Sequence, residues 1–145
     1  MQITSRFTIA VHIITCIGFF GDKEKVTSRF LSGSIGANPV IIRNVMSSLK
    51  DDGLLISQQG KSGIVLGRPL DQISFFDIYQ AVDPIAENGL FHFHENANED
   101  CPVGRNIHQA LDGKLERIQK VMEDEMKKIS VADVYDDVMG QLERT

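Results

Sequence analysis

Apolar residues in the first twenty positions recur at steps of three and four residues, a spacing that places them on one face of a helix. The residues of this face are Phe7, Ala10, Val11, Ile14 and Ile17. We therefore predict an amphipathic helix over residues 4–20, which Gly21 helps to end. Cys16 lies within this segment, and we expect it to serve as a small buried apolar residue.

Two shorter helices are predicted next, because residues that cap helix ends stand at suitable places. Thr27 can accept a hydrogen bond at the start of a helix that Gly36 stops. The pair Asn38-Pro39 opens the following helix, since asparagine satisfies unpaired N–H groups and proline has no N–H to leave unpaired. Gly53 is the expected stop of that third helix. Its buried face is expected to carry Ile41, Val45 and Leu49.

The segment after the third helix is typical of a hairpin. Residues 54–58 and 64–66 have the composition of strands, and the glycines within 60–63 suit a turn between them. Two helices joined by a tight turn and followed by a hairpin form the winged helix-turn-helix pattern. We expect a mostly α-helical fold with a small β-hairpin wing.

The second half of the chain is predicted to be helical. Ser74 and Asp77 form a capping box that starts a short helix over 75–82. From Pro102 onward, apolar residues recur at steps of three and four, which predicts a long amphipathic helix close to a coiled-coil seam, with a last helix over 131–142. We expect the long helix to join two copies of the chain through Ile107, Leu111, Leu115, Ile118, Met122 and Met126.

Charge is distributed unevenly along the chain, whose net charge is −5. Residues 1–70 carry eight lysines and arginines against four acids, a net charge of +4, whereas residues 71–145 carry seven against sixteen, a net charge of −9. The asymmetry predicts that the first half faces DNA. We expect a DNA-binding domain over 1–83, and a sensor loop with C-terminal dimerisation helices over 84–145.

The exposed face of the third helix has side chains that suit the major groove of double-stranded DNA. Arg43 can bind guanine in a bidentate way, Asn44 can do the same for adenine, and Val40 can contact a thymine methyl group. Contacts to phosphates, which fix the register without reading the sequence, are expected from Ser28, Arg29 and Lys50. The candidate DNA contacts together are Ser28, Arg29, Asn38, Pro39, Val40, Arg43, Asn44, Ser47, Lys50 and Lys61. Each residue taken singly could equally be a solvated polar position.

Seven segments of the chain carry a resemblance to a known family: 5–7, 38–43, 49–54, 66–69, 73–82, 90–95 and 101–107. In this order they resemble the BadM/IscR-type, or Rrf-two, family of bacterial winged-helix regulators. The last two segments are most similar to its YwnA-like subgroup. The resemblance implies a homodimer joined through the long C-terminal helices, with two recognition helices in successive major grooves of a palindromic site. It also implies transcriptional repression as the usual outcome.

The wing departs from the pattern of this family. Relatives often have an Arg-Gly pair and further glycines there, whereas here Gln59 precedes Gly60 and Ile64 replaces a glycine. Lys61 is the candidate substitute for that arginine, and it could approach the DNA backbone or enter the minor groove.

Some relatives hold an iron–sulfur cluster through three cysteines and a further ligand in the loop before the long helix. Here Cys101 matches the last of those cysteines, the other two are absent, and Gly104 stands where a histidine ligand is found. A cluster needs about four protein ligands. We expect no iron–sulfur cluster and no other cofactor.

Cys101 remains as the candidate sensor residue. It directly precedes Pro102 at the expected start of a helix, where the free N–H groups and the helix dipole favour a thiolate. Its expected effector is a small oxidant or electrophile. His92, His94 and His108 have the chemistry of zinc or copper ligands, but their spacing matches no standard site. We favour the interpretation that these histidines line a polar groove of the dimer.

Other functional classes find less support in the sequence. It lacks a phosphate loop, a dinucleotide fingerprint, a nucleophile elbow and a His-Glu-x-x-His motif, so we do not expect an enzyme. It also lacks a long apolar run and a signal peptide, so we expect a cytoplasmic protein without a membrane partner. Two alternatives remain open, namely a winged-helix module that docks a protein partner, and a helical scaffold dimer without a ligand.

Overall fold

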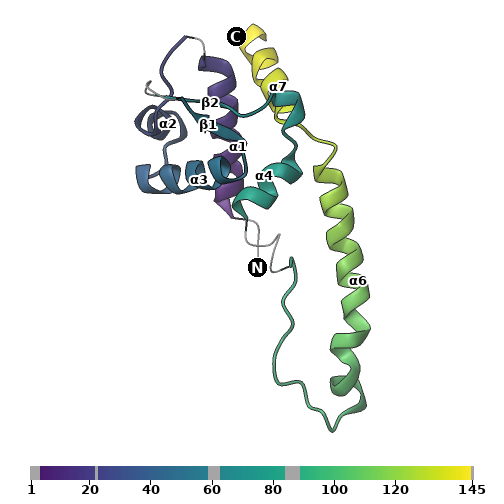
Figure 1. Cartoon of the computed structure of the whole chain (residues 1–145). Helices are drawn as coiled ribbons and strands as arrows, with labels where there is room; N and C mark the ends of the chain where they lie inside the picture. The colour runs from purple at the N-terminus through teal and green to yellow at the C-terminus, as the bar shows by residue number, and fades with distance from the viewer. Residues whose placement is uncertain (1–3, 22, 59–62, 84–88, 145) are drawn as a thin grey trace.

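The computed structural model describes residues 4–21, 23–58, 63–83 and 89–144. Its elements in chain order are α1 (Ser5–Phe20), α2 (Ser28–Ile35), α3 (Pro39–Asp51), β1 (Leu55–Ser57), β2 (Ile64–Leu66), η1 (Leu70–Gln72), α4 (Phe75–Val82), α6 (Pro102–Met126) and α7 (Val131–Arg144). Figure 1 shows a body built from α1 to α4, the hairpin and α7, from which α6 extends away. The predicted mostly α-helical fold with a small hairpin is confirmed. None of the described helices is long and apolar enough to cross a membrane.

The predicted capping residues form the helix ends of the body. The Thr27 hydroxyl accepts from the Phe30 N–H, and Gly36 ends α2 in the left-handed conformation at φ 77°. The Asn38 side chain accepts from the Val40 N–H at the start of α3. These local hydrogen bonds make the turn between α2 and α3 short, as a helix-turn-helix requires.

The wing is a two-stranded antiparallel hairpin. Strands β1 and β2 pair with Leu55 opposite Leu66 and Ser57 opposite Ile64. Leu55 is buried, whereas Ile56 and Ser57 are exposed, so the hairpin packs against the body at its base. The hairpin turn lies largely outside the described residues.

One hydrophobic core holds the body together, and α1 lies at its centre. Helix α1 packs against α2, α3, α4 and α7. The fully buried residues of α1 include Ala10, Ile13 and Ile14, so the predicted apolar face is present and extends further around the helix than the periodicity indicated. Cys16 is buried, in agreement with its expected role.

Helix α7 packs against the body, although α6 before it extends away from the body. Residues far apart in sequence therefore lie side by side (Figure 1). Val131 is fully buried in the core, and its N–H donates to the carbonyl of Ile73 at 2.9 Å. The division of the chain at residue 83 stays a prediction. In the structure α7, which follows that boundary, packs against α1 and η1.

Candidate functional site

Helix α3 separates its apolar residues from its polar ones. Its buried residues are Ile42, Val45, Met46 and Leu49. Its exposed residues include Val40, Arg43, Asn44, Ser47 and Lys50, which is the set predicted to face DNA. The helix thus presents five candidate contact residues to the solvent on the face opposite the core.

The expectation that Ile41 belongs to the buried face is wrong. Ile41 is 42% exposed, and Ile42 is fully buried in its place. Three apolar residues follow one another at positions 40–42, so the sequence pattern alone could not fix the rotation of the helix. Ile42 stands three residues before Val45 and seven before Leu49, which is the spacing that places all three on one side.

A recess of about 430 Å³ lies between the start of α2, the face of α3 and the wing. Among the residues that line it are Thr27, Ser28, Arg43, Ser47 and Lys50. Ser28 is the first residue of α2, where backbone N–H groups lack helical partners and favour an anion. Two cationic side chains and a helix N-terminus therefore meet in one hollow of suitable size for a phosphate group.

The other predicted DNA contacts lie around this recess. Arg29 is exposed on α2, and Pro39 is exposed at the start of α3. The side-chain oxygen of Asn38 already accepts from the Val40 N–H, so the helix cap occupies it. Lys61, the predicted contact of the wing, lies outside the described residues.

Arg6 is a structural residue of this site that the sequence reasoning missed. Its Nε donates to the carbonyl of Val82 at 3.2 Å, and its terminal nitrogen donates to the Ser48 hydroxyl at 3.3 Å. Arg6 thereby ties the start of α1 to both α3 and the end of α4. A cation on the first turn of an otherwise apolar helix is the signal that could have indicated such a role.

Cys101 is exposed and occupies the N-cap position of α6. The backbone N–H groups of Gly104 and Val103, in the first turn of α6, lower the pKa of the thiol. Hydrogen bonds to the charged form have this effect because they stabilise the thiolate. The geometry thus provides an accessible and acidified thiol at the predicted position.

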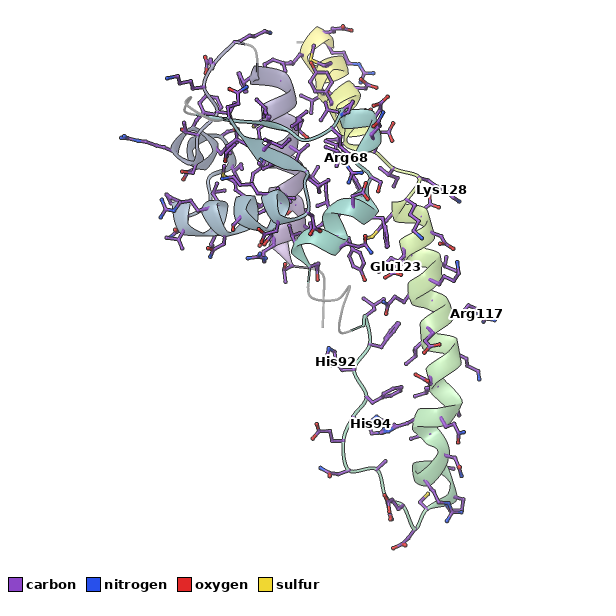
Figure 2. All side chains as sticks on the ribbon, viewed as in Figure 1. Arg68, His92, His94, Arg117, Glu123 and Lys128 are labelled. Carbon is purple, nitrogen blue, oxygen red and sulfur yellow. The ribbon has the colours of Figure 1, made fainter. Side chains whose placement is uncertain are left out.

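His92 and His94 lie on the segment before α6 (Figure 2), and His108 lies on α6 itself. The His108 ring stacks on Phe93 at 4.7 Å between centroids and meets the His94 ring edge-on at 5.1 Å. His92 lines a separate groove. Within the part of the chain that the structure describes, no group of three His, Cys, Asp or Glu residues is placed to hold a metal ion.

The surroundings of Cys101 do not fit an iron–sulfur cluster. Cys16 is buried in α1, so Cys101 has no second thiolate beside it. A Cβ atom at Gly104 would overlap the carbonyl oxygen of Asn98, so no side chain could project from that position without moving the loop. The position to which the resemblance assigns a histidine ligand is therefore blocked by the backbone of Asn98.

Helix α6 has no fully buried residue in the single chain. Of the residues predicted to mediate dimerisation, Ile118 is 50% exposed, while Ile107, Leu111, Leu115, Met122 and Met126 are half-buried. Val121 is 64% exposed beside Ile118, and Val103 is also exposed. The sequence reasoning did not include these two valines. The described structure therefore leaves an apolar stripe on α6 open to solvent.

Comparison with known proteins gives consistent matches over nearly the whole chain. The Rrf2 family, described as an iron-dependent transcriptional regulator, matches residues 3–137. YwnA of Bacillus subtilis strain 168, assigned as an HTH-type transcriptional regulator, is 39% identical over 133 residues, which cover 92% of this chain and 96% of YwnA.

Solved structures agree with this assignment. A crystal structure of a protein assigned as DNA-binding is 32% identical with a TM-score of 0.71, covering 90% of this chain and 98% of the other. A crystal structure assigned as a transcriptional regulator from Lactobacillus plantarum is 28% identical with a TM-score of 0.74, covering 92% and 89%. These proteins are regulators and not enzymes, as the sequence led us to expect. The chain therefore belongs to the Rrf2 family of transcriptional regulators.

Proposed function

We propose that this chain binds double-stranded DNA as a homodimer and represses transcription from a palindromic operator in the cytoplasm. The observation that carries the proposal is the exposed polar face of α3, which is held rigidly by the buried residues on its other side. On that face Arg43 reads guanine, Asn44 reads adenine and Val40 contacts a thymine methyl group. A buried opposite face supports these contacts because it fixes the helix relative to the body.

In this proposal, the recess between α2, α3 and the wing binds a phosphate group of the DNA backbone. Lys50 and Arg43 supply positive charge, and the start of α2 supplies N–H donors. Phosphate contacts of this kind orient a protein on the duplex without reading its sequence. They explain how a chain with a net charge of −5 can still bind a polyanion, since the binding face is basic.

Dimerisation through α6 places two such faces on one duplex. The exposed residues Ile118 and Val121 of the two copies would cover each other in an isologous contact. A two-fold dimer matches an operator with two-fold sequence symmetry, with the half-sites about one helical turn apart.

The proposed signal is chemical modification of the Cys101 thiolate, without an iron–sulfur cluster. With a peroxide, the sulfur attacks one oxygen, an S–O bond forms, the O–O bond breaks and hydroxide leaves, so the product is a sulfenic acid. The uncharged sulfenic acid is no longer favoured by the Gly104 and Val103 N–H groups as the thiolate is. The start of α6 would then move, and with it the spacing of the two α3 helices.

The test is binding of the purified protein to its own promoter region across a salt series. A steep fall of affinity with salt is expected, because phosphate contact displaces condensed counterions. Arg43→Ala should lose specific binding by about tenfold or more, while Arg117→Ala on α6 serves as the matched control. Absence of specific binding at low salt would contradict the proposal and favour a protein-docking module.

A further inference from the structure

A groove of about 580 Å³ lies between the segment 89–93 and α6, away from the DNA-facing surface. Figure 2 shows the segment that bears His92 running alongside α6, with Glu123 at the end of the helix that faces the body. The residues that line the groove include Phe91, Phe93, Asp112, Glu116, Gln119 and Glu123. Its volume lies in the range of small-molecule sites.

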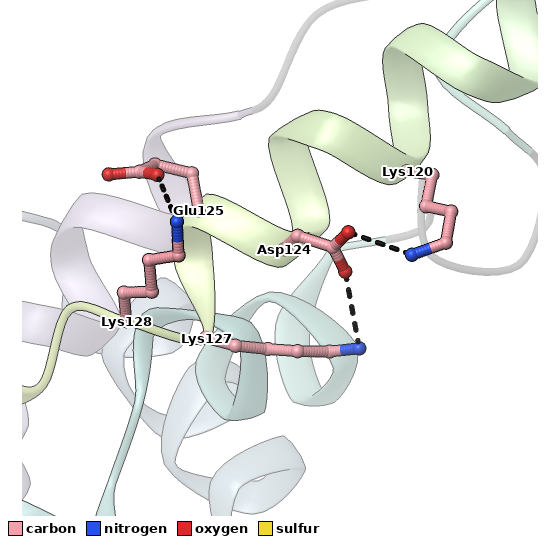
Figure 3. Close-up of polar contacts among 5 residues, drawn as sticks. All are labelled: Lys120, Asp124, Glu125, Lys127 and Lys128. Carbon is pink, nitrogen blue, oxygen red and sulfur yellow. Dashed lines mark hydrogen bonds and ion pairs between the residues drawn. The ribbon is translucent and has the colours of Figure 1, made fainter.

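The charges around the groove favour a cation. Asp112, Glu116 and Glu123 contribute three carboxylates to the lining. Lys120 also lines the groove, but its ammonium group is 2.7 Å from Asp124, which neutralises it (Figure 3). Asp124 is further held by Lys127 at 3.8 Å, so this ion-pair network lies at the edge of the groove and leaves the three carboxylates unbalanced.

The opposite wall of the groove is aromatic. Phe91 is 41% exposed and Phe93 is 38% exposed, although both are large apolar residues. Exposed rings that face carboxylates across a hollow suit an organic cation, because ring faces attract positive charge and also cover methylene groups.

The spacing of the carboxylates along α6 favours an extended ligand over a compact one. Asp112, Glu116 and Glu123 are separated by four and seven residues, so they lie on one face of α6. Eleven residues of helix span about 16 Å at 1.5 Å per residue. A compact amine could meet only one of these groups, whereas an extended chain with several ammonium groups could meet all three.

We propose that this groove binds a linear polyamine. The ammonium groups lie against Asp112, Glu116 and Glu123, and the alkyl segments between them lie against Phe91 and Phe93. The binding step does not depend on the proposed DNA contacts, because none of these residues belongs to α2, α3 or the wing.

The groove is connected to the body through a chain of hydrogen bonds. The Leu90 N–H donates to Gln119 Oε1 at 2.8 Å, and Gln119 Nε2 donates to Glu123 Oε2 at 3.2 Å. The same oxygen of Glu123 accepts from the Tyr79 hydroxyl of α4 at 3.0 Å. A bound ammonium group and Tyr79 would therefore share the carboxylate of Glu123, which links occupancy of the groove to the junction of α4 and α6.

The groove borders the proposed dimer face. Ile118 and Val121 stand six and nine residues after Asp112, which places them on a different side of the helix from Asp112, Glu116 and Glu123. Leu115 lines the groove and also belongs to the residues expected to mediate dimerisation, so the two surfaces meet at this residue.

The experiment is calorimetric titration of the full chain with spermidine, without DNA, in buffer of physiological ionic strength. We expect saturable binding, weakened about tenfold in the double variant Asp112→Asn/Glu116→Gln because two ion pairs are lost. Glu143→Gln on α7 removes one carboxylate charge outside the groove and should bind as the native protein does. Phe91→Ala should also weaken spermidine binding, because the alkyl segments lose an aromatic contact.

A second variant tests the connection to the body. Tyr79→Phe removes one donor to Glu123 and leaves more of the charge of this carboxylate to the ligand, so it should tighten spermidine binding by about threefold or more. Absence of saturable binding would overturn the proposal, as would equal weakening in the groove variants and in Glu143→Gln, which would indicate unspecific attraction to an acidic protein. Tighter binding of citrate than of spermidine would also overturn it. Absence of spermidine binding would leave binding to the promoter region unaffected, so the two proposals can be refuted independently.

Discussion

The phenolic oxygen of Tyr79 lies 3.0 Å from Glu123 Oε2 and donates a hydrogen bond to it across 44 positions of sequence. Tyr79 is fully buried in the body, and Glu123 belongs to the long helix that leaves it. The Lys127 ammonium lies over the Phe76 ring at 4.6 Å in the same region. These side chains hold the orientation of α6 relative to the DNA-binding body, so changes in them should alter stability and regulation together.

Tyr79→Phe should lower the free energy of unfolding by about 1–3 kcal/mol, because a buried hydrogen bond to a charged acceptor is lost. Urea unfolding of the native protein, Tyr79→Phe, Glu123→Gln and the double variant forms a cycle that measures the coupling. Tyr135→Phe on α7 is the matched control. Additive effects of the two single changes would show that the contact contributes nothing.

The pKa of the Tyr79 hydroxyl is raised by burial and by the neighbouring Glu123. The folded state therefore holds this proton more tightly than the unfolded state, whose tyrosines titrate near pH 10. The contribution of this group to stability is complete below about pH 10 and is lost as the pH rises toward the folded value. Tyr79→Phe should show a smaller loss of stability between about pH 9 and 11 than the native protein does. Identical alkaline profiles would contradict this prediction.

Gly67→Ala and Gly113→Ala should change stability in opposite directions. A Cβ atom at Gly67 would overlap the backbone carbonyl of Gly53, so the hairpin base must shift at a cost of about 1–3 kcal/mol. Gly113 lies within α6 with nothing near its missing Cβ, so alanine there should stabilise by about 0.5–1 kcal/mol through helix propensity. Thermal unfolding of the two variants measures both effects, and equal shifts would refute the packing argument.

Cys101 should react faster with iodoacetamide than Cys16 does. The lowered pKa of the Cys101 thiol makes more thiolate at neutral pH, and the residue is exposed, whereas Cys16 is buried. The rate should rise with pH around a midpoint below that of the same protein unfolded in urea. Mass spectrometry of modified peptides assigns each rate, and Cys101→Ser removes the fast phase. A midpoint equal to that of the unfolded chain would contradict the role of the Gly104 and Val103 N–H groups.

Ile118→Glu should convert the protein to a monomer, because it places a charge in the centre of the proposed dimer face. Light scattering at micromolar concentration measures the mass, and circular dichroism checks that the helices persist. Gln109→Glu adds the same charge at another exposed position of α6 and should leave the dimer intact. A dimeric Ile118→Glu protein would require a different interface.

Features encoded by neighbouring residues were predictable from the sequence. The Ser74 and Asp77 capping box forms as expected, with both reciprocal hydrogen bonds present. The Asn38-Pro39 start of α3 is likewise a local signal. Caps of this kind depend on residues within one turn, and their chemistry is specific enough to fix a helix end.

Features that depend on distant residues were not predictable. The contacts of Arg6 with Ser48 and Val82 join segments that no periodicity relates. The choice between Ile41 and Ile42 was decided by packing against the core, since either fits a local helical pattern. The groove beside α6 arises from the path of the segment 89–93, which carries no regular secondary structure and hence no pattern.

The return of α7 to the body has a consequence for synthesis of the protein on the ribosome. The Phe75 N–H donates to the Ile129 carbonyl, and Val131 fills the core from the C-terminal side. The body therefore lacks part of its core while residues 129–131 are still inside the exit tunnel. Since non-local contacts of this kind close late, the newly made chain completes this core only after these residues have left the tunnel, and a chain truncated before residue 131 would be a substrate for proteases.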